Sequence, residues 1–397
     1  MRSVCVIGLG YVGLPLALLS AEKGYTVYGL ENHPRKAETI VHAHKNILVN
    51  HPDALSADVI IIAVPTPVDE SKNPDLTSVR VACEQIAEKL VGKGQLIILE
   101  STVNPFISRK FVLPILEKRG LLEGKDFFLA HCPERIDPGN AKWNVSNISR
   151  VVGALNPEGL EKVKNFYQSI LSAEVLPLSS IEAAEMTKIY ENSLRAVNIA
   201  FANEMAIVMQ NMKLDAKEVI NGVKTKPFGL DLCNPSCGVG GHCIPVDPFY
   251  LIDESLKRGF DPSFLRIAMK VNGYMPSYTV SLLTHALNEV GKSVKGTKVG
   301  VLGVAYKKNV DDVRESPALV IINRIMGLGA DLKVYDPFLP EYSNATKDEV
   351  LACDAILLLT DHTEFLDYDF SGVSVLIDGK NVLDKSRVGG IYKGIGR

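Results

Sequence analysis

A glycine-rich turn between an apolar strand and an apolar helix constrains the fold of this chain more than any other feature. Residues 3–7 have the composition of a buried parallel strand, and Gly8-Leu9-Gly10-Tyr11-Val12-Gly13 follows them directly and opens a helical pattern. In such a turn Gly8 permits the tight bend, Gly10 lets a pyrophosphate approach the backbone, and Gly13 lets helix and strand pack closely. The sequence therefore predicts a dinucleotide-binding β-α-β unit at its start.

The end of the second predicted strand indicates which dinucleotide binds. Residues 26–30 form that strand, and Glu31 follows it. A carboxylate at this position binds the ribose 2′-hydroxyl and repels a 2′-phosphate, so the sequence favours NAD over NADP. Arg35 leaves NADP open, because an arginine nearby could accommodate that phosphate.

Two further apolar strands, at residues 57–64 and 96–102, end in hydroxyl-bearing side chains. In an open α/β sheet the residues beyond the carboxyl ends of the strands line the ligand crevice. Thr66, Ser101 and Thr102 are therefore candidates for the crevice, with an ordinary role in turns or helix caps as the alternative.

A loop with two prolines and a glycine, residues 133–139, follows another apolar strand. These residues restrict the loop, which favours a fixed placement of Glu134 and Arg135 at a site. A solvated surface loop is the alternative interpretation.

Residues 181–212 form a long helical pattern without proline or glycine. Lys188, Asn192 and Arg195 stand at i, i+4 and i+7 and therefore share one face. We interpret them as donors for an oxyanion and a ligand, with an exposed polar stripe as the alternative. A helix of this length also offers a subunit interface.

Three glycines, a cysteine and a carboxylate fall within Cys237-Gly238-Val239-Gly240-Gly241-His242-Cys243-Ile244-Pro245-Val246-Asp247. We interpret this loop as a nucleophile site, because a thiol attacks carbon only as thiolate and its neighbours set how much thiolate exists. The glycines Gly238, Gly240 and Gly241 would let the backbone wrap closely around a ligand. One alternative is an inert buried thiol at Cys243. The other is zinc held by Cys233, Cys237, His242 and Cys243, although the paired Cys-x-x-Cys spacing of structural sites is missing.

A second α/β pattern closes the chain. Residues 298–306 resemble the first strand and turn, and residues 353–360 echo residues 57–64. The glycine fingerprint is incomplete there, because Tyr306-Lys307-Lys308 stands where it would continue. Lysines at this point would hold a second anionic ligand, or they are plain surface charges.

The composition limits the partners and the compartment. The chain has 397 residues, 46% of them hydrophobic, with a formal net charge of −3, which suits a globular protein of two or three domains and argues against nucleic acid as a partner. We find no signal peptide and no apolar run of membrane-spanning length. Seven cysteines, an odd number, fit reduced thiols in the cytoplasm better than a disulfide framework.

Together these motifs predict an α/β protein with two Rossmann-like doubly wound domains joined by a central helical region that contains one long helix. We place an NAD-binding domain at residues 1–178, a central helical and catalytic-loop region at 179–292, and a second Rossmann-like domain at 293–397.

The ordered motifs resemble those of the nucleotide-sugar 6-dehydrogenases, the family of UDP-glucose, GDP-mannose and UDP-N-acetylhexosamine dehydrogenases. The resemblance covers nearly the whole chain. The matching segments are Gly8-Leu9-Gly10-Tyr11-Val12-Gly13, Val64-Pro65-Thr66-Pro67, Glu100-Ser101-Thr102, Pro133-Glu134-Arg135, Glu191-Asn192-Ser193 through Asn203-Glu204, Gly240-Gly241-His242-Cys243 and Arg314-Glu315-Ser316-Pro317.

The resemblance implies two hydride transfers to NAD⁺ from carbon 6 of the sugar, converting an alcohol to a carboxylate for polysaccharide biosynthesis. It implies Cys243 as the nucleophile, Lys188 and Asn192 at the oxyanions, Asp247 in proton transfer, and Glu134 with a water near Thr102 in hydrolysis. It also implies that residues 293–397 form a UDP-sugar-binding domain and that the central helix forms a homodimer. The cofactor-binding candidates are Gly8, Gly10, Tyr11, Val12, Gly13, Glu31, Arg35, Pro65, Thr66, Ser101, Thr102 and Arg314. The substrate-binding candidates are Glu134, Arg135, Lys188, Asn192, Arg195, Phe228, Gly229, Gly238, Gly240, Gly241 and Lys307, and no metal is expected.

Within the family, Cys132-Pro133-Glu134-Arg135-Ile136-Asp137-Pro138-Gly139 resembles the N-acetylhexosamine branch, and Lys226-Pro227-Phe228-Gly229 resembles its UDP-N-acetylglucosamine 6-dehydrogenases more than its N-acetylmannosamine enzymes. Three positions depart from the family. Cys237 is an extra thiol, either a harmless replacement or a partner that could inactivate the nucleophile by oxidation. Glu31 replaces the more common aspartate, and the link from Glu31 to Ala57 is short and is expected to lack a helix.

Two other functions remain open from the sequence. A two-electron dehydrogenase would use Cys243 only as a structural residue. A non-catalytic NAD- or UDP-sugar-binding protein would be consistent with the short link.

Overall fold

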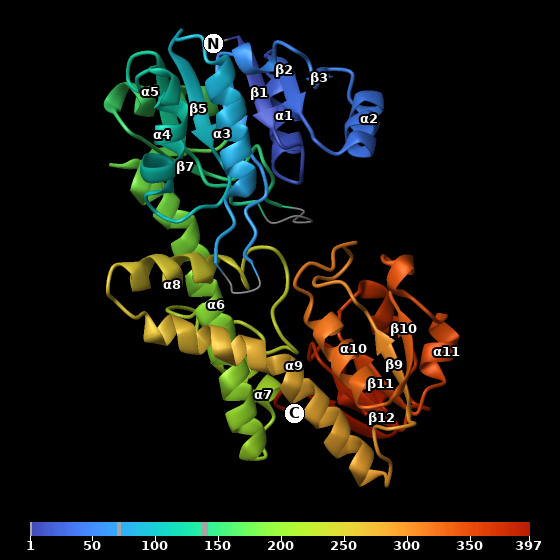
Figure 1. Ribbon diagram of the computed structural model, residues 1–397. Helices are drawn as coiled ribbons and strands as arrows, with labels where there is room; N and C mark the ends of the chain where they lie inside the picture. The colour runs from blue at the N-terminus through green and yellow to red at the C-terminus, as the bar shows by residue number, and fades with distance from the viewer. Residues whose placement is uncertain (1, 70–72, 137–141) are drawn as a thin grey trace. The chain divides into compact units, whose positions relative to one another are not determined.

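The computed structural model describes residues 2–69, 73–136 and 142–397, which form two compact units. Unit 1 comprises Met1–Glu191 and Phe249–Phe260, and unit 2 comprises Asn192–Pro248 and Asp261–Arg397. Two helices, α6 (Ile181–Asn211) and α8 (Asp247–Lys257), contribute residues to both units. Many of the elements of each unit are labelled in Figure 1.

An eight-stranded sheet organises unit 1, in the order β3-β2-β1-β4-β5-β6-β7-β8. Neighbouring strands are parallel except for β6 and β7, which are antiparallel. The strands are β1 (Ser3–Ile7), β2 (Thr26–Leu30), β3 (Ile47–Val49), β4 (Val59–Ile62), β5 (Gln95–Leu99), β6 (Phe127–His131), β7 (Arg150–Ala154) and β8 (Val175–Pro177). The order β3-β2-β1-β4-β5 is that of a doubly wound dinucleotide-binding fold.

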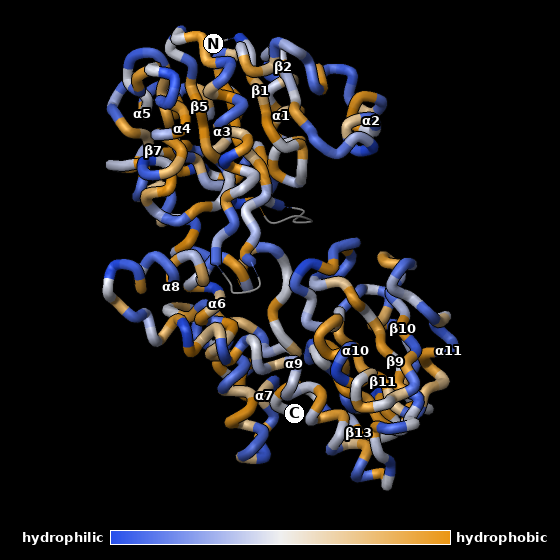
Figure 2. The backbone as a smooth tube through the Cα atoms, in the orientation of Figure 1, coloured by the Kyte–Doolittle hydropathy of each residue, from blue (hydrophilic) through white to orange (hydrophobic). Residues whose placement is uncertain are grey.

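Helices cover both faces of this sheet. Val4 and Val6 of β1 pack in the cluster that contains α1 (Gly13–Glu22) and α5 (Pro157–Ile170). Cys5 and Ile7 face the opposite way, into the cluster of α3 (Thr77–Lys89) and α4 (Leu113–Leu116). A parallel strand that is buried on both faces needs a continuous apolar run, which is why β1 and β5 are hydrophobic throughout most of their length (Figure 2).

The link after β2, which we expected to lack a helix, contains one, so that prediction is wrong. Helix α2 (Pro34–Ala43) and strand β3 both lie in it. Pro34 suits the first turn of a helix, and the imidazole of His33 accepts the backbone N–H of Lys36 as a cap. Ala37 and Ile40, three residues apart, are the buried side of α2. The helix is short but has its cap and its apolar face.

Unit 2 combines helices with a second sheet. Its helical part contains most of α6, α7 (Ala216–Val223) and α9 (Ser263–Glu289). The sheet has five parallel strands in the order β10-β9-β11-β12-β13. They are β9 (Lys298–Leu302), β10 (Asp331–Tyr335), β11 (Ala355–Leu358), β12 (Val375–Asp378) and β13 (Ile391–Gly394), with α10 (Pro317–Gly327) and α11 (Lys347–Leu351) between them. Two Rossmann-like sheets and one long central helix confirm the predicted fold class.

The two sheets repeat one turn in detail. The N–H of Gly8 donates to Leu30 after β1, and the N–H of Gly303 donates to Tyr335 after β9, at 2.8 and 2.9 Å. An acidic residue follows the neighbouring strand in each sheet, Glu31 after β2 and Asp336 after β10. The predicted internal repeat is therefore present in the backbone hydrogen bonds.

The carboxylate of Asp336 fills the turn after β9. It accepts the backbone N–H groups of Val304 and Ala305 at 2.7 and 3.0 Å, and it contacts the buried imidazole of His362 at 3.1 Å. Burial alone would raise its pKa, but these hydrogen bonds outweigh burial and lower the pKa to about 2. The backbone donors that could bind a ligand phosphate in this turn are thus already used by the chain itself.

Candidate active site

The turn after β1 has the geometry that a dinucleotide requires. Gly8 has φ of +91°, and a side chain there would lie 2.6 Å from the carbonyl oxygen of Ala63. A Cβ on Gly13 would lie 1.9 Å from the carbonyl oxygen of Gly8, so α1 can approach β1 only with glycine at this position. A Cβ on Gly10 would meet no atom within 4 Å, which leaves its backbone open to a ligand at the start of α1. Tyr11 is 61% exposed beside it, and Val12 immediately precedes the helix.

Glu31 lies where a ribose hydroxyl would be bound. Lys36 contacts its carboxylate at 2.8 Å, and the backbone N–H of His33 donates to it. Burial raises the pKa of Glu31, but the hydrogen bonds from Lys36 and His33 outweigh burial and lower it. The carboxylate is therefore ionised and can accept a hydrogen bond from a hydroxyl group, while Arg35 is exposed on α2. These residues fit NAD.

The hydroxyl groups after β4 and β5 bind the backbone. Thr66 donates to the carbonyl of Thr102 at 2.8 Å, and Ser101 donates to the carbonyl of Val64 at 2.7 Å, on either side of Pro65. The hydroxyl of Tyr250, on the part of α8 that belongs to unit 1, donates to the carbonyl of Thr66. Thr66 and Ser101 therefore connect the two strand ends, which is the turn role that the sequence left open.

Glu134 belongs to a buried ionic network that the sequence did not reveal. Its carboxylate accepts the backbone N–H groups of Arg135 and Ile136, both at 2.6 Å, and contacts the guanidinium of Arg150 at 2.7 Å. Arg150 has no exposed surface, and it also lies 3.6 Å from Glu100. The only signal in the sequence was a charged residue at one end of each of two apolar strands: Glu100 directly follows β5, and Arg150 is the first residue of β7.

The guanidinium of Arg135 is occupied by one ion pair and by a hydrogen bond to the backbone. Its guanidinium contacts the Glu191 carboxylate at 2.5 Å and donates to the carbonyl of Ser149 at 3.1 Å. The loop is thus fixed at residues 134–136, as its prolines predict. Its last predicted residues, 137–139, lie outside the described part of the chain.

The predicted row on α6 is only partly buried. Lys188 and Asn192 are each 8% exposed, whereas Arg195, one turn further on, is exposed. Among the described residues Lys188 makes no hydrogen bond or ion pair, so its ammonium group is available to a ligand. The amide of Asn192 donates to the buried carboxylate of Asp247 at 2.5 Å. The sequence made Asn192 and Asp247 candidates for the site, but it did not show that their side chains form a hydrogen bond with each other.

Cys243 lies at the N-terminal end of α8. Its carbonyl accepts the backbone N–H groups of Val246 and Asp247 at 3.0 and 2.8 Å, which makes the loop continuous with the first turn of the helix. The thiol-bearing residue is half-buried. Cys243 stands four residues before Asp247, the first residue of α8, and a helix N-terminus favours negative charge nearby.

The glycines of the loop pack closely against unit 2 itself. A Cβ on Gly238 would lie 2.8 Å from Pro317, and Cβ atoms on Gly240 and Gly241 would lie 2.6 and 2.8 Å from Tyr306. The N–H of Gly241 also donates to the carbonyl of Arg314 at 2.9 Å. We expected these glycines to surround a ligand, and the close contacts that the structure provides are with protein atoms.

Arg314 forms a bidentate pair with its neighbour Asp312, with a shortest distance of 2.7 Å. Burial raises the pKa of Asp312, and the hydrogen bonds from Arg314 reverse this and lower it. Three other candidates lie on the surface or near it. Phe228 is 69% exposed with the ammonium of Lys226 5.0 Å from its ring centre, Gly229 has φ of +76°, and Lys307 is half-buried.

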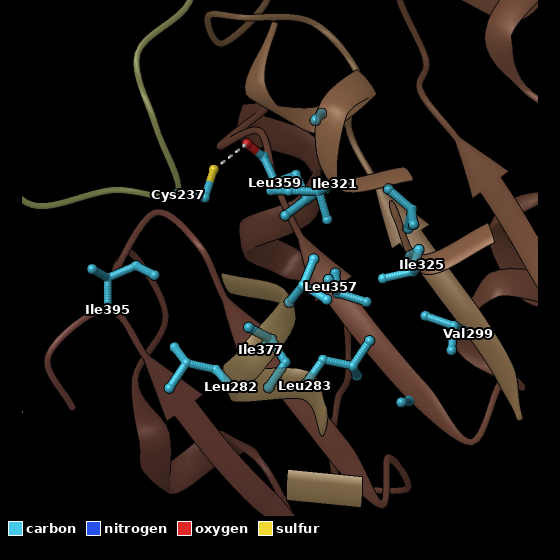
Figure 3. Close-up of a cluster of buried hydrophobic side chains, with 14 of the residues drawn as sticks. Cys237, Leu282, Leu283, Val299, Ile321, Ile325, Leu357, Leu359, Ile377 and Ile395 are labelled. Carbon is cyan, nitrogen blue, oxygen red and sulfur yellow. Dashed lines mark hydrogen bonds between the residues drawn. The ribbon is translucent and has the colours of Figure 1, made fainter. Parts of the chain in front are cut away.

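Cys237 is a core residue, not a second reactive thiol. It is fully buried, its N–H donates to Gly379 at 2.7 Å, and its sulfur approaches the carbonyl of Leu359 at 3.7 Å (Figure 3). Burial raises the pKa of its thiol. The structure therefore argues against oxidation of Cys237 together with Cys243, because a buried protonated thiol is unreactive.

No group of three or more His, Cys, Asp or Glu side chains able to hold a metal occurs in the described ranges. Within the same ranges, no helix is both long and apolar enough to span a membrane.

Family models match most of the chain. They describe the NAD-binding domain at residues 48–171, the central domain at 182–274 and the UDP-binding domain at 300–388 of the UDP-glucose/GDP-mannose dehydrogenase family. The chain belongs to this family. It is an NAD-dependent nucleotide-sugar dehydrogenase, and the predicted family and cofactor are confirmed.

Known relatives align with nearly the whole length of this chain. A UDP-N-acetyl-D-mannosamine dehydrogenase from Pyrococcus horikoshii is 32% identical, over 99% of each chain. A UDP-N-acetyl-D-glucosamine 6-dehydrogenase from Pseudomonas aeruginosa is 34% identical, over 97% of this chain and 98% of the relative. The solved structure of the UDP-D-ManNAc dehydrogenase from Pyrococcus horikoshii superposes with a TM-score of 0.93 at 32% identity, covering 100% of this chain and 99% of that one. These dehydrogenase relatives agree with the N-acetylhexosamine branch predicted from the sequence.

Proposed function

We propose that this enzyme oxidises carbon 6 of a UDP-N-acetylhexosamine from the alcohol to the carboxylate, with Cys243 as the nucleophile. The observation that carries the proposal is a half-buried cysteine at the N-terminal end of α8, in the same unit as the hydrogen-bonded Asn192–Asp247 pair. A two-electron alcohol dehydrogenase has no step that needs such a thiol.

The proposed chemistry assigns each group one task. NAD⁺, when bound, accepts a hydride from carbon 6 in each of two oxidations. After the first oxidation the Cys243 thiolate bonds to the aldehyde carbon and forms a thiohemiacetal, and the second oxidation turns this into a thioester. Water then adds to the thioester carbon, the carbon–sulfur bond breaks, and the thiolate and the sugar acid are released.

The neighbouring residues would manage charge and protons. The Lys188 ammonium group and the second amide hydrogen of Asn192 would stabilise the oxyanions on carbon 6. Asp247, which already accepts from Asn192, would take the alcohol proton. Glu134 would accept a proton from the attacking water, with Thr102 nearby in the proposed site.

We further propose that residues 1–178 hold NAD, that 179–292 supply the catalytic loop and the subunit interface, and that 293–397 hold the UDP group. The reduced state that Cys243 needs fits the cytoplasm, where we place the enzyme.

The sequence favours UDP-N-acetyl-D-glucosamine as the substrate. UDP-N-acetyl-D-mannosamine is the second candidate, because several relatives bear that name. The two sugars differ only at carbon 2, where one hydrogen bond can decide the preference. The decisive experiment incubates the purified enzyme with NAD⁺ and, separately, with UDP-glucose and the UDP-linked N-acetyl forms of glucosamine, mannosamine and galactosamine, and identifies the products by mass.

We expect two NADH per sugar acid. One NADH per product, with aldehyde released, would contradict the four-electron mechanism. NAD binding without NADH from any of these sugars would indicate a non-catalytic binding protein.

We also propose a homodimer through the central helix. Leu194, Phe201 and Val208 recur every seven residues on α6 and are 47%, 66% and 41% exposed, so they form an apolar stripe. A stripe of this kind on a monomer surface indicates a protein interface.

Phe201→Glu should therefore convert the dimer to a monomer, because a buried unpaired carboxylate is costly at an interface. The measurement is light scattering coupled to size-exclusion chromatography. Leu328→Glu is the control, since Leu328 is 48% exposed but follows α10, far along the chain from the stripe. A dimer that survives Phe201→Glu at micromolar concentration would contradict the proposed interface.

A further inference from the structure

One guanidinium serves two carboxylates in the interior of unit 1. Arg150, the first residue of β7, has no exposed surface. It contacts Glu134 at 2.7 Å and Glu100 at 3.6 Å. Glu100 directly follows β5 and stands two residues before Thr102, whereas Glu134 follows β6. The loops that carry two proposed catalytic residues therefore share one buried cation.

The contacts of Glu134 determine its orientation. One carboxylate oxygen accepts the backbone N–H groups of Arg135 and Ile136, and the other faces Arg150. With both oxygens held, the side chain has little freedom to rotate. Glu134 lies closer to the Arg150 guanidinium than Glu100 does, so it is the more strongly attracted of the two carboxylates.

Glu100 completes the network from the opposite side. The hydroxyl of Tyr167, on α5, donates to Glu100, and the ring of Tyr167 lies 5.8 Å from the Arg150 guanidinium. Burial raises the pKa of Glu100 to about 7, since the charge of Arg150 only partly offsets it and that of Glu134 adds to it.

The cost of this arrangement argues against a purely structural role. Burying a guanidinium and two carboxylates is expensive, and replacing such groups by apolar residues is often neutral or stabilising. The network is thus a poor source of stability, but it does fix the position of the Glu134 carboxylate.

We propose that Arg150 is a positioning residue for thioester hydrolysis, which holds the Glu134 carboxylate in the orientation that it needs to act on the attacking water. The inference rests on the proposed function, because it assigns Glu134 to the hydrolytic step. It predicts that loss of Arg150 slows hydrolysis while both oxidations continue.

The test uses Arg150→Lys in the full-length enzyme, which keeps a positive charge but cannot contact both carboxylates as a guanidinium does. We expect kcat to fall on the order of 10²-fold, the usual contribution of a positioned base, and the KM for NAD⁺ to stay unchanged. Rapid-quench intact mass should show the sugar acyl group accumulating on Cys243. A merely structural defect would slow oxidation and hydrolysis together, without an acyl-enzyme.

Tyr167→Phe is the matched control, because it removes a buried polar contact of Glu100 and leaves the Arg150–Glu134 pair in place. It should accumulate no acyl-enzyme. If Arg150→Lys does not fold, Glu100→Gln decides the question, since it leaves Arg150 to Glu134 alone. Because the Arg150–Glu134 pair remains in this variant, it should accumulate no acyl-enzyme, and accumulation of the acyl-enzyme would overturn the inference.

The two levels of the proposal fail in different ways. A wild-type enzyme that makes one NADH per product and no thioester would contradict the proposed function itself. A wild-type enzyme that behaves as proposed, beside an Arg150→Lys enzyme with normal turnover and no acyl-enzyme, would overturn only the role of Arg150.

Discussion

Cys243→Ser is expected to abolish the formation of sugar acid, with turnover reduced on the order of 10³-fold or more. A serine hydroxyl is scarcely ionised near neutral pH and does not form the thioester that water must cleave. NAD affinity should be unchanged, because the turn that fits NAD lies after β1. The measurement combines NADH release with the mass of the product, after circular dichroism has shown that the variant folds.

Cys237→Ala is the control for this experiment. It removes a thiol from the same loop, but Cys237 is fully buried with its sulfur near Leu359. We expect a stability loss of about 1–2 kcal/mol from the lost packing and full production of acid. Undiminished acid production by Cys243→Ser would refute the nucleophile assignment, and loss of activity in Cys237→Ala would place the reactive thiol elsewhere.

Gly13→Val should lose both stability and NAD binding. The first added carbon would lie 1.9 Å from the carbonyl oxygen of Gly8 and 3.0 Å from the side chain of Val6, so α1 must move away from β1. We expect destabilisation of about 3 kcal/mol or more, the range of severe overpacking, measured by urea unfolding.

Gly10→Ala separates packing from binding in the same turn. A Cβ at Gly10 meets no protein atom within 4 Å, so the unfolding midpoint should not change. The methyl group does enter the space that the pyrophosphate needs, and the Kd for NAD⁺ should rise at least tenfold in calorimetric titration. Wild-type stability in Gly13→Val, or wild-type NAD affinity in Gly10→Ala, would contradict this account of the turn.

The sequence predicted the elements whose signals are local. β1, β2 and α6 begin where their apolar patterns begin, because buried parallel strands and long helices impose a composition on consecutive residues. The link helix α2 was missed because we compared its length with that of the family instead of reading the cap at His33 and the apolar pair Ala37 and Ile40.

Contacts between distant segments could not be predicted in this way. Arg150 and Glu100 each look like an isolated charge beside a strand, and only the pairing of β5, β6 and β7 brings them to Glu134. The same holds for Asn192 and Asp247, which are 55 positions apart. The glycines of the Cys243 loop stood out in the sequence. Their contact with Tyr306 could not be predicted, because any residue with a large side chain could pack against them.

The carboxylate in the turn after β9 has a consequence for inhibitor design. A compound that imitates the pyrophosphate of NAD meets open backbone at Gly10, but at Val304 and Ala305 it meets the ionised Asp336. The repulsion would exclude it from this turn of the second sheet, even though both sheets have the same topology there. Dinucleotide mimics should therefore occupy one site per chain, and a compound selective for the C-terminal sheet would need a neutral or cationic group at that position.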